Sequence, residues 1–381
     1  MTYLSYCARV PGKLMIAGEY AVLEPKKKAV VIAVNRYVTA YIKPSRNNQI
    51  SLPQFGLENI TWKMGNDGVR FSVLDCRLNF IQNSIAVAAK FLQEKSIVLR
   101  PFKLKVISEL DDPVTGQKYG LGSSAAVVVS IISAILSLHS DGKEPPTSEE
   151  IFKLSAIVHL ETQGNGSGAD IAAAVYGGWL EYSAYSCKWI LKELHQGERL
   201  TEIIGKQWPN LSIRRLTAPS MLHLAVGWTK AAAATAPMIK SIQKFRENNI
   251  EAYREFLRES TISVEKLIRS FEFQDCTEAI KALSQTRKAL LKLGERAGTN
   301  IETSKLKVLC SVADKFGSGK SSGAGGGDCG IAFLKNANER QDLYKAWKAR
   351  GITPLDLTVS KMGAYTYKVT NENWSKFELS S

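Results

Sequence analysis

The stretch Lys118-Tyr119-Gly120-Leu121-Gly122-Ser123-Ser124-Ala125-Ala126 joins a glycine-containing loop to a long apolar run that ends at Leu138. The two glycines let the backbone approach a phosphate group closely, and the serines can cap a helix whose first N–H groups face an anion. The run from 125 to 138 is apolar on nearly every side, so as a helix it belongs in the protein interior. The segment therefore predicts a phosphate-binding loop before a buried helix. A capped core helix that binds nothing is the alternative.

This loop differs from two common phosphate-binding motifs. It is not a Walker A loop, because no lysine follows the second glycine. It is not a G-x-G-x-x-G loop either, because Ala125 stands in the place of the third glycine. The loop taken alone leaves the identity of the ligand open.

A second glycine cluster runs from Lys320 to Gly330 and reads Lys-Ser-Ser-Gly-Ala-Gly-Gly-Gly-Asp-Cys-Gly. Successive backbone amides in such a turn can form a concave nest for an anion. Gly/Ser-rich segments are also typical of flexible linkers. The apolar residues Ile331 to Phe333 follow at once and favour the anion nest, because they lead directly into core.

A third segment, Pro11 to Tyr20, places Lys13 in an otherwise apolar stretch. An unpaired ammonium group would be costly in such surroundings. Pairing with a substrate anion or with a carboxylate would remove that cost, whereas a lysine that points outward from a half-exposed strand is the alternative. Lys13 is therefore a candidate for binding a phosphate group.

Size and composition restrict the class of protein. The chain has 381 residues, 45% of them hydrophobic, which is enough for one large domain or two lobes that share an interface. The start carries no pattern of a secretory signal, and the apolar run at 125–138 is shorter than the roughly 20 residues that span a bilayer. Six scattered cysteines and four histidines lack metal-ligand spacing. We expect a cytoplasmic protein, monomeric or homodimeric, with no zinc site and no membrane partner.

The net charge of +14 suits an anionic ligand. Its basic residues are spread along the chain, with Lys26-Lys27-Lys28 as the only tight cluster. No dense basic stripe and no RNP-like aromatic pattern appears, so a nucleic-acid-binding protein is the disfavoured alternative. Phosphorylated small molecules are the expected ligands.

Strand-like and helix-like patterns separate along the chain. Alternating or β-branched runs predict strands over 30–35, 38–43, 102–107, 211–216, 222–227, 330–334 and 364–369. Helical spacing predicts helices over 78–94, 125–138, 151–160, 169–176, 238–294, 306–316 and 342–350. This segregation favours an α+β fold over a doubly wound parallel sheet. Gly, Pro and polar residues between 194 and 219 suggest a boundary between lobes at 1–205 and 206–381.

The three segments around Lys13, Gly122 and Gly325 resemble the signature motifs of the GHMP kinases, in the family's order and at family-like spacing. The resemblance covers essentially the whole chain. It implies an N-terminal lobe like ribosomal protein S5 domain 2, with ATP over the 120–125 loop. It also implies a ferredoxin-like C-terminal lobe, with the acceptor between the lobes.

The resemblance further implies roles for individual residues. Lys13 would bridge donor and acceptor phosphates, and Asp170, in Gly164-Asn165-Gly166-Ser167-Gly168-Ala169-Asp170, resembles the aspartate that serves as base in related kinases. ATP is expected at Lys118, Gly120, Leu121, Gly122, Ser123, Ser124 and Ala125, with Mg²⁺ on Ser123 or Ser124. The acceptor is expected at Lys13, Tyr20, Ser167, Lys320, Ser322, Gly323, Ala324, Gly325 and Gly326.

Several of these roles have competing interpretations. Glu161 is the nearest candidate for a second metal ligand, although its spacing to Asp170 fits the family poorly. Asp170 could simply cap the following helix, and Lys320 could be a solvated loop lysine. Lys230 could reach the acceptor or be an exposed lysine at the start of a helix. The tryptophans at 62, 179 and 228 are expected in the core more than against an adenine ring.

Two residues bear on the nature of the acceptor. Gly18-Glu19-Tyr20 has a tyrosine where family members that act on an alcohol, such as mevalonate kinases, typically have histidine. Asp328 is an acidic residue that their third motif usually lacks. Both differences favour members whose acceptor is itself a phosphate group. Such an acceptor is largely ionised near neutral pH, its second pKa being about 6, so Asp170 is expected mainly to hold Lys13. An alcohol kinase, with Asp170 as a true base, is the alternative.

Overall fold

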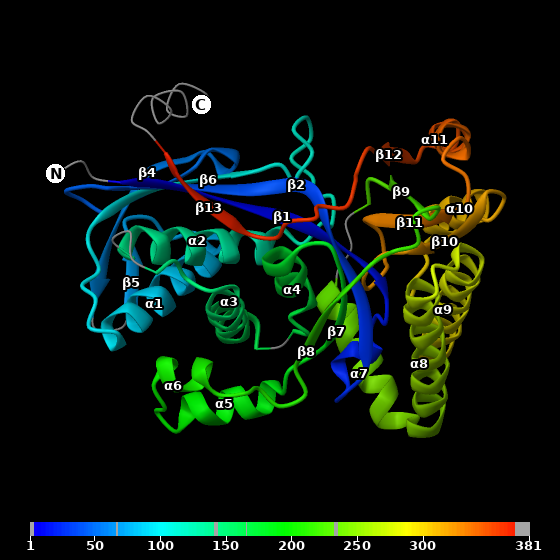
Figure 1. Cartoon of the computed structure of the whole chain (residues 1–381), viewed down its shortest axis with the longest axis horizontal. Helices are drawn as coiled ribbons and strands as arrows, with labels where there is room; N and C mark the ends of the chain where they lie inside the picture. Colours follow the sequence, from blue (N-terminus) through cyan, green and yellow to red (C-terminus); the bar gives the residue numbers. More distant parts are fainter. Residues whose placement is uncertain (1–3, 66–67, 141–143, 165, 232–234, 370–381) are drawn as a thin grey trace.

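The computed structural model describes residues 4–65, 68–140, 144–164, 166–231 and 235–369. Within these ranges the chain forms two lobes, each built on a β-sheet with helices against it (Figure 1). The sheets have nine and four strands. In this part of the chain, no helix is long and apolar enough to cross a membrane.

The larger lobe packs helices on one face of a mixed sheet (Figure 1). Its strands are β1 (Ser5–Ala17), β2 (Lys28–Pro44), β3 (Gln49–Leu52), β4 (Leu57–Gly65), β5 (Gly68–Phe71), β6 (Phe102–Ser108), β7 (Trp179–Ser183), β8 (Ser212–Leu216) and β13 (Tyr365–Val369). Its helices are α1 (Asn79–Glu94), α2 (Ser123–His139), α3 (Ser148–Gln163), α4 (Ala169–Tyr176), α5 (Cys187–His195) and α6 (Leu200–Gly205). The main strand order is β13-β1-β2-β6-β3-β4-β5, while β7 pairs with β2 and β8 with β7.

Strand β2 combines two of the predicted strands. The runs 30–35 and 38–43 are the two halves of one strand of 17 residues. Its first half pairs with β7 and its second half with β6. Ala29 to Val34 are fully buried, which explains why this half reads as a continuous apolar run instead of an alternating one.

Helix α2 is the buried helix that the sequence predicts. It lies between the strands β1 and β2 on one side and the helices α1, α3 and α4 on the other. Every residue from Val128 to His139 is buried. Gly122, at the N-cap, has a φ of 77°, a left-handed conformation that glycine adopts readily. The glycine loop therefore enters the helix by a turn that suits glycine.

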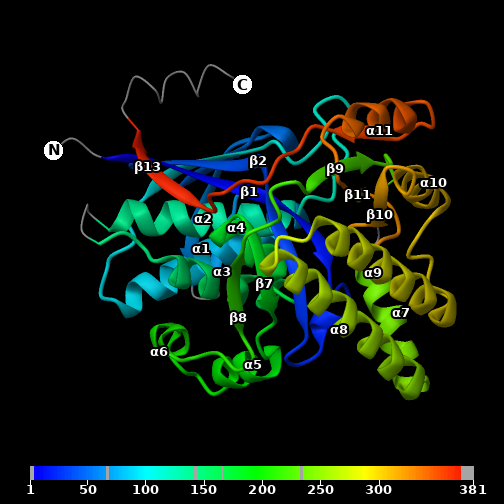
Figure 2. The same ribbon diagram turned by 45° about the vertical axis from the view of Figure 1, so that its right-hand side comes forward.

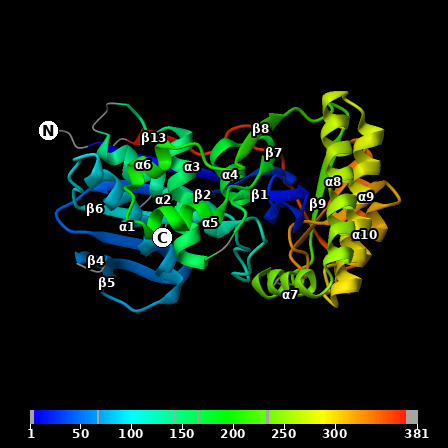
Figure 3. The ribbon, with the colours of Figure 1, turned by 90° about the horizontal axis from the view of Figure 1, so that it is seen from below.

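The smaller lobe contains an antiparallel sheet of order β10-β11-β9-β12. Its strands are β9 (His223–Trp228), β10 (Gly317–Ser321), β11 (Cys329–Leu334) and β12 (Thr353–Leu355). Its helices are α7 (Thr235–Asn248), α8 (Ile250–Glu272), α9 (Cys276–Ala297), α10 (Ser304–Ala313) and α11 (Glu339–Lys348). The predicted helical stretch 238–294 is thus three helices. Figures 2 and 3 show α8 and α9 side by side at the outer flank of this lobe.

Two segments after residue 205 belong to the larger sheet. Strand β8 pairs with β7, and strand β13 pairs with β1. Apolar residues of α8 and α9, such as Leu267 and Leu283, join the same core cluster as the larger lobe. We therefore propose that the smaller lobe begins after β8 and that the chain returns to the larger lobe before β13.

Strand β10 is an element that the sequence patterns did not indicate. Its sequence, Gly-Ser-Gly-Lys-Ser, has low β-propensity. Its glycines are needed for close packing, because a Cβ at Gly317 would collide with the backbone of Phe333 and one at Gly319 would lie 2.7 Å from Ala313 Cβ. The sequence patterns also did not predict the helices α5 and α6 or the strands β1, β3, β4, β5, β7 and β12.

Candidate active site

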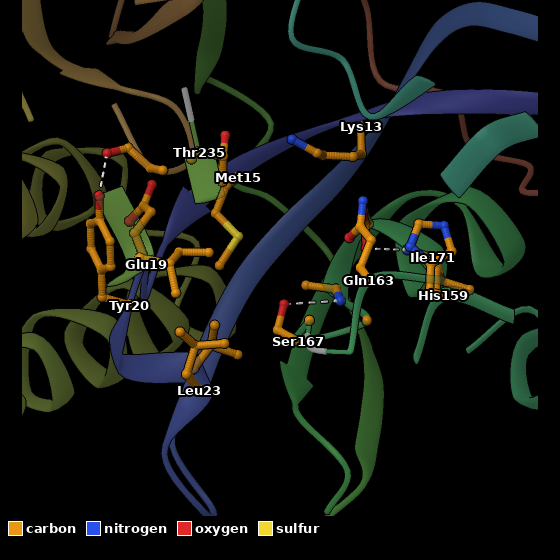
Figure 4. Close-up of a pocket in the computed structure, with 18 of the residues that line it drawn as sticks. Lys13, Met15, Glu19, Tyr20, Leu23, His159, Gln163, Ser167, Ile171 and Thr235 are labelled. Carbon is orange, nitrogen blue, oxygen red and sulfur yellow. Dashed lines mark hydrogen bonds between the residues drawn. The ribbon is translucent and has the colours of Figure 1, made fainter. Parts of the chain in front are cut away.

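A cavity of about 220 Å³ lies between the two lobes, and residues of the first segment, around Lys13, and of the second glycine cluster, around Gly323, line it. Figure 4 shows β1 and the turn after it on one side and α3 with the start of α4 on the other. The lining includes the predicted residues Lys13, Tyr20, Ser167, Asp170, Gly323 and Ala324. A second cavity of about 380 Å³ shares Gly166, Ser167 and Tyr185 with it, so the combined space suits a small molecule.

Lys13 connects the phosphate loop with this cavity. Its backbone N–H donates to the carbonyl of Leu121 at 2.8 Å, and its ammonium lies 3.4 Å from the carbonyl oxygen of Gly120. The lysine stem packs on Gly122, where a Cβ would lie 2.8 Å from Lys13 Cγ. Glycine is thus favoured at position 122 for two reasons: a side chain there would crowd Lys13, and the backbone has a positive φ. The half-buried Lys13 side chain thus borders both the glycine loop and the cavity.

The two glycine segments meet beside Lys13. Gly120, with a φ of 79°, packs so closely on Asp328 that a Cβ would lie 2.6 Å from its side chain. The thiol of Cys329 donates to the carbonyl of Tyr119 at 3.0 Å. The residues Gly120 to Ala125 border the cavity through Lys13 and are not part of its lining. The structure therefore brings the predicted ATP loop and the predicted acceptor loop together.

Lys320 is not where the sequence analysis expected it. The side chain is 0% exposed, and its ammonium donates to a carboxylate oxygen of Glu19 and to the carbonyl of Ser321. It cannot reach a bound phosphate from this position. The sequence could not reveal the pairing, because Glu19 lies 301 positions away. Lys320 is a structural cation that joins β10 to the end of β1.

Other predicted acceptor ligands also link the first and third segments. The Ser322 hydroxyl accepts from the Met15 N–H at 3.0 Å and donates to the Met15 carbonyl at 2.9 Å. The Tyr20 hydroxyl donates to the Ala324 carbonyl at 2.6 Å (Figure 4). Both hydroxyls are thereby engaged by the backbone.

The turn at Gly325 and Gly326 packs on Ile301. A Cβ at Gly325 would collide with the Ile301 carbonyl, and the Gly326 N–H donates to that carbonyl at 2.8 Å. This part of the turn is therefore used for packing. Gly323 and Ala324 are the residues of the turn that line the cavity.

Asp170 lines the cavity from the first turn of α4. Its Oδ1 accepts a hydrogen bond from the N–H of Ile171 at 3.0 Å (Figure 4). It is not the N-cap of the helix, because Gly168 holds that position. Among the described residues, the ion pairs do not include one between Asp170 and Lys13, so the expected direct contact is wrong for this structure. The two groups instead face one cavity from different elements.

The residues proposed to hold Mg²⁺ fit only in part. Ser123 and Ser124 are half-buried at the start of α2, where their hydroxyls can complement a metal ion held mainly by nucleotide phosphates. Glu161 is exposed on α3 and does not line the cavity, so it is not placed as the second ligand. The described residues contain no group of three His, Cys, Asp or Glu side chains that could hold a metal by themselves.

The remaining candidates lie outside the cavity. Lys118 is exposed, and Lys230 is exposed with its ammonium 5.9 Å from the centre of the Trp228 ring. Trp62 and Trp228 are buried in the core, and Trp179 packs on Phe271 with ring centres 5.0 Å apart. The tryptophans therefore pack as the sequence analysis favoured.

Two family models match the chain, one in each lobe. The model "GHMP kinases N terminal domain" matches residues 80–178, and "GHMP kinases C terminal" matches residues 242–353. The chain is a GHMP kinase. A phosphomevalonate kinase from Streptomyces sp. strain CL190 is 32% identical to it over 369 residues, which cover 93% of this chain and 96% of the relative.

Solved structures agree with this assignment. A protein from Listeria innocua aligns with a TM-score of 0.89 and 34% identity, over 96% of this GHMP kinase and 100% of that chain. The Streptococcus pneumoniae phosphomevalonate kinase in complex with phosphomevalonate and AMPPNP aligns with a TM-score of 0.80 and 29% identity, over 93% and 99% of the two chains. The predicted family and its two-lobed α+β fold are confirmed.

The cavity of this GHMP kinase also contains polar residues that the sequence analysis did not assign. Glu19, His159 and Gln163 all line it. Burial lowers the pKa of His159, and the nearby Asp170 charge partly opposes this, so the imidazole is neutral at neutral pH. His159 lies among the apolar residues of α3, so the sequence cannot distinguish it from a histidine that only packs in the core. The sequence offered one indication for Glu19, which is its position next to Tyr20 in the first motif.

Proposed function

We propose that this GHMP kinase transfers the γ-phosphoryl group of ATP to the phosphate of 5-phosphomevalonate, forming 5-diphosphomevalonate and ADP. One observation carries the proposal: Lys13 contacts the glycine loop at Gly120 and Gly122 and also lines the cavity between the lobes. The relatives named phosphomevalonate kinase support the choice of acceptor, as do Tyr20 and Asp328 in the motifs. Because the reaction needs ATP, we place it in the cytoplasm.

The proposed chemistry depends on alignment and charge. Phosphoryl transfer needs donor and acceptor oxygens in line and positive charge beside the moving group. The Lys13 ammonium would supply that charge between the two phosphates, and the first N–H groups of α2 would hold the nucleotide phosphates. Mg²⁺, carried in with ATP, would neutralise its β- and γ-phosphate oxygens, with Ser123 or Ser124 as protein ligands.

An ADP-release assay across four acceptors tests the proposal. We expect turnover with 5-phosphomevalonate and none above background with mevalonate, homoserine or galactose. Release of ADP with mevalonate but not with 5-phosphomevalonate would select the alternative, a mevalonate kinase. No ADP release with any of the four would overturn the proposed function.

The Asp170→Asn variant distinguishes the two kinds of acceptor by mechanism. Asparagine keeps an oxygen for the Ile171 N–H, so the local structure is retained. With a phosphate acceptor, which is already ionised, we expect kcat to fall by less than about tenfold. A fall of roughly 10² to 10⁴ in steady-state kcat would instead identify Asp170 as a general base.

A further inference from the structure

The Glu19 carboxylate has one oxygen without a partner. The residue is only 3% exposed, and one of its oxygens is bound by the ammonium of Lys320. Among the described residues, the other oxygen, Oε2, is buried and has no hydrogen-bond partner. Glu19 also lines the cavity, on the wall formed by β1 and the turn after it (Figure 4).

An unsatisfied buried carboxylate oxygen calls for an explanation, because leaving such a group unpaired costs about 1–3 kcal/mol or more. Because Glu19 lines the cavity, a small rotation of its carboxylate would let a ligand there supply the missing donor. The donor must be an O–H or N–H group, since an ionised carboxylate only accepts hydrogen bonds. The Glu19 carboxylate would repel a phosphate or carboxylate group. It would therefore bind a neutral O–H or N–H group of the ligand, while Lys13 attracts an anionic group.

Lys320 makes such a carboxylate compatible with an anionic substrate. The lysine is fully buried and neutralises the charge of Glu19 without reaching the cavity itself. On the opposite wall, His159 Nε2 is also buried and has no hydrogen-bond partner among the residues that the structure describes. Lys13 is the cation that lines the cavity in the described part of the chain. The cavity thus has a cation for an anionic group at Lys13 and a hydrogen-bond acceptor at Glu19.

We propose that Glu19 accepts a hydrogen bond from the hydroxyl group of the acceptor, and that Lys320 is a positioning residue that holds the carboxylate for this contact. The inference rests on the proposed function, because 5-phosphomevalonate combines a phosphate with a single hydroxyl group, at C3. The site then discriminates hydroxylated phosphate acceptors from analogues that lack the hydroxyl. An analogue without the hydroxyl would be a poorer substrate, because Oε2 of Glu19 stays unpaired when it binds.

The test compares 5-phosphomevalonate with its 3-deoxy analogue in three proteins. In the wild type, we expect removal of the hydroxyl to lower kcat/KM by about 10- to 100-fold, mostly through KM. In Glu19→Met/Lys320→Met, which replaces the pair by apolar side chains of similar size, we expect the two acceptors to differ by less than about threefold. The control Arg287→Met/Glu302→Met removes another ion pair of low exposure, outside the cavity lining, and should keep the wild-type ratio.

The outcomes separate this inference from the proposed function. A wild type that uses 5-phosphomevalonate but does not distinguish the deoxy analogue overturns the role of Glu19. If the double variant still distinguishes the two acceptors, the role of Glu19 is also overturned, and another residue, for example His159, would bind the hydroxyl. A wild type inactive on 5-phosphomevalonate defeats the proposed function instead.

A single variant keeps the test valid if the double variant does not fold. In Glu19→Gln the amide oxygen can stay with Lys320, and only a neutral group faces the hydroxyl. Because hydrogen bonds to neutral partners are weaker than those to charged ones, we expect discrimination to fall at least about threefold. An unchanged ratio in this variant would again count against the proposal.

Discussion

Lys13→Met is expected to lose at least about 10³-fold of turnover while the protein stays folded. In the proposed arrangement the ammonium lies between the donor and acceptor phosphates, so its loss would leave the charge of the transferring group uncompensated. The methionine keeps the stem that packs on Gly122, so the loop need not rearrange. An ADP-release assay and a thermal melt measure the two effects separately.

A matched control makes the Lys13 result specific. Lys103 is also a half-buried lysine on a strand, β6, and is not among the described residues that line the cavity. Lys103→Met should retain wild-type turnover. More than a tenth of the wild-type rate in Lys13→Met would show that the proposed arrangement of donor and acceptor is wrong.

Lys320→Met is expected to destabilise the protein by about 3–5 kcal/mol. The substitution leaves the carboxylate of Glu19 buried with no counter-charge, which is far more costly than the loss of a surface ion pair. Urea denaturation followed by circular dichroism measures the change in the free energy of unfolding. Adding Glu19→Met should restore most of it, because the uncompensated charge is then gone.

The same experiment separates two interpretations of Lys320. If the lysine binds substrate, as its place in the glycine motif suggested, the variant would keep its stability and lose affinity for the acceptor. If it is a structural cation, stability falls first. The exposed Lys118 provides the control, since Lys118→Met should change the unfolding free energy by less than about 0.5 kcal/mol. A Lys320→Met protein within 1 kcal/mol of the wild type would contradict the structural role.

Local patterns in the sequence were sufficient to find part of what builds the site. The apolar run after Gly122 predicted the buried helix α2, and the three motifs identified the family and picked out Lys13. Both predictions depend on residues close together in the chain. The environment of these residues is decided largely by neighbours within one helix or one turn, so the local sequence is enough to predict it. The sequence patterns did not predict strand β10, because its glycines allow close packing but have low β-propensity.

The roles of individual polar side chains were decided only by the tertiary structure. A lysine in a phosphate-loop motif and a lysine buried against Glu19 look identical in sequence, since the partner is 301 positions away. The same holds for Ser322, whose hydroxyl is bound to the backbone of Met15, and for β13, which returns to the first strand of the larger sheet. Sequence by itself determined the family, the buried helix and the lysine beside the phosphate loop. Which polar groups pair with each other and which stay free for a ligand depends on contacts between distant segments, and only folding brings those segments together.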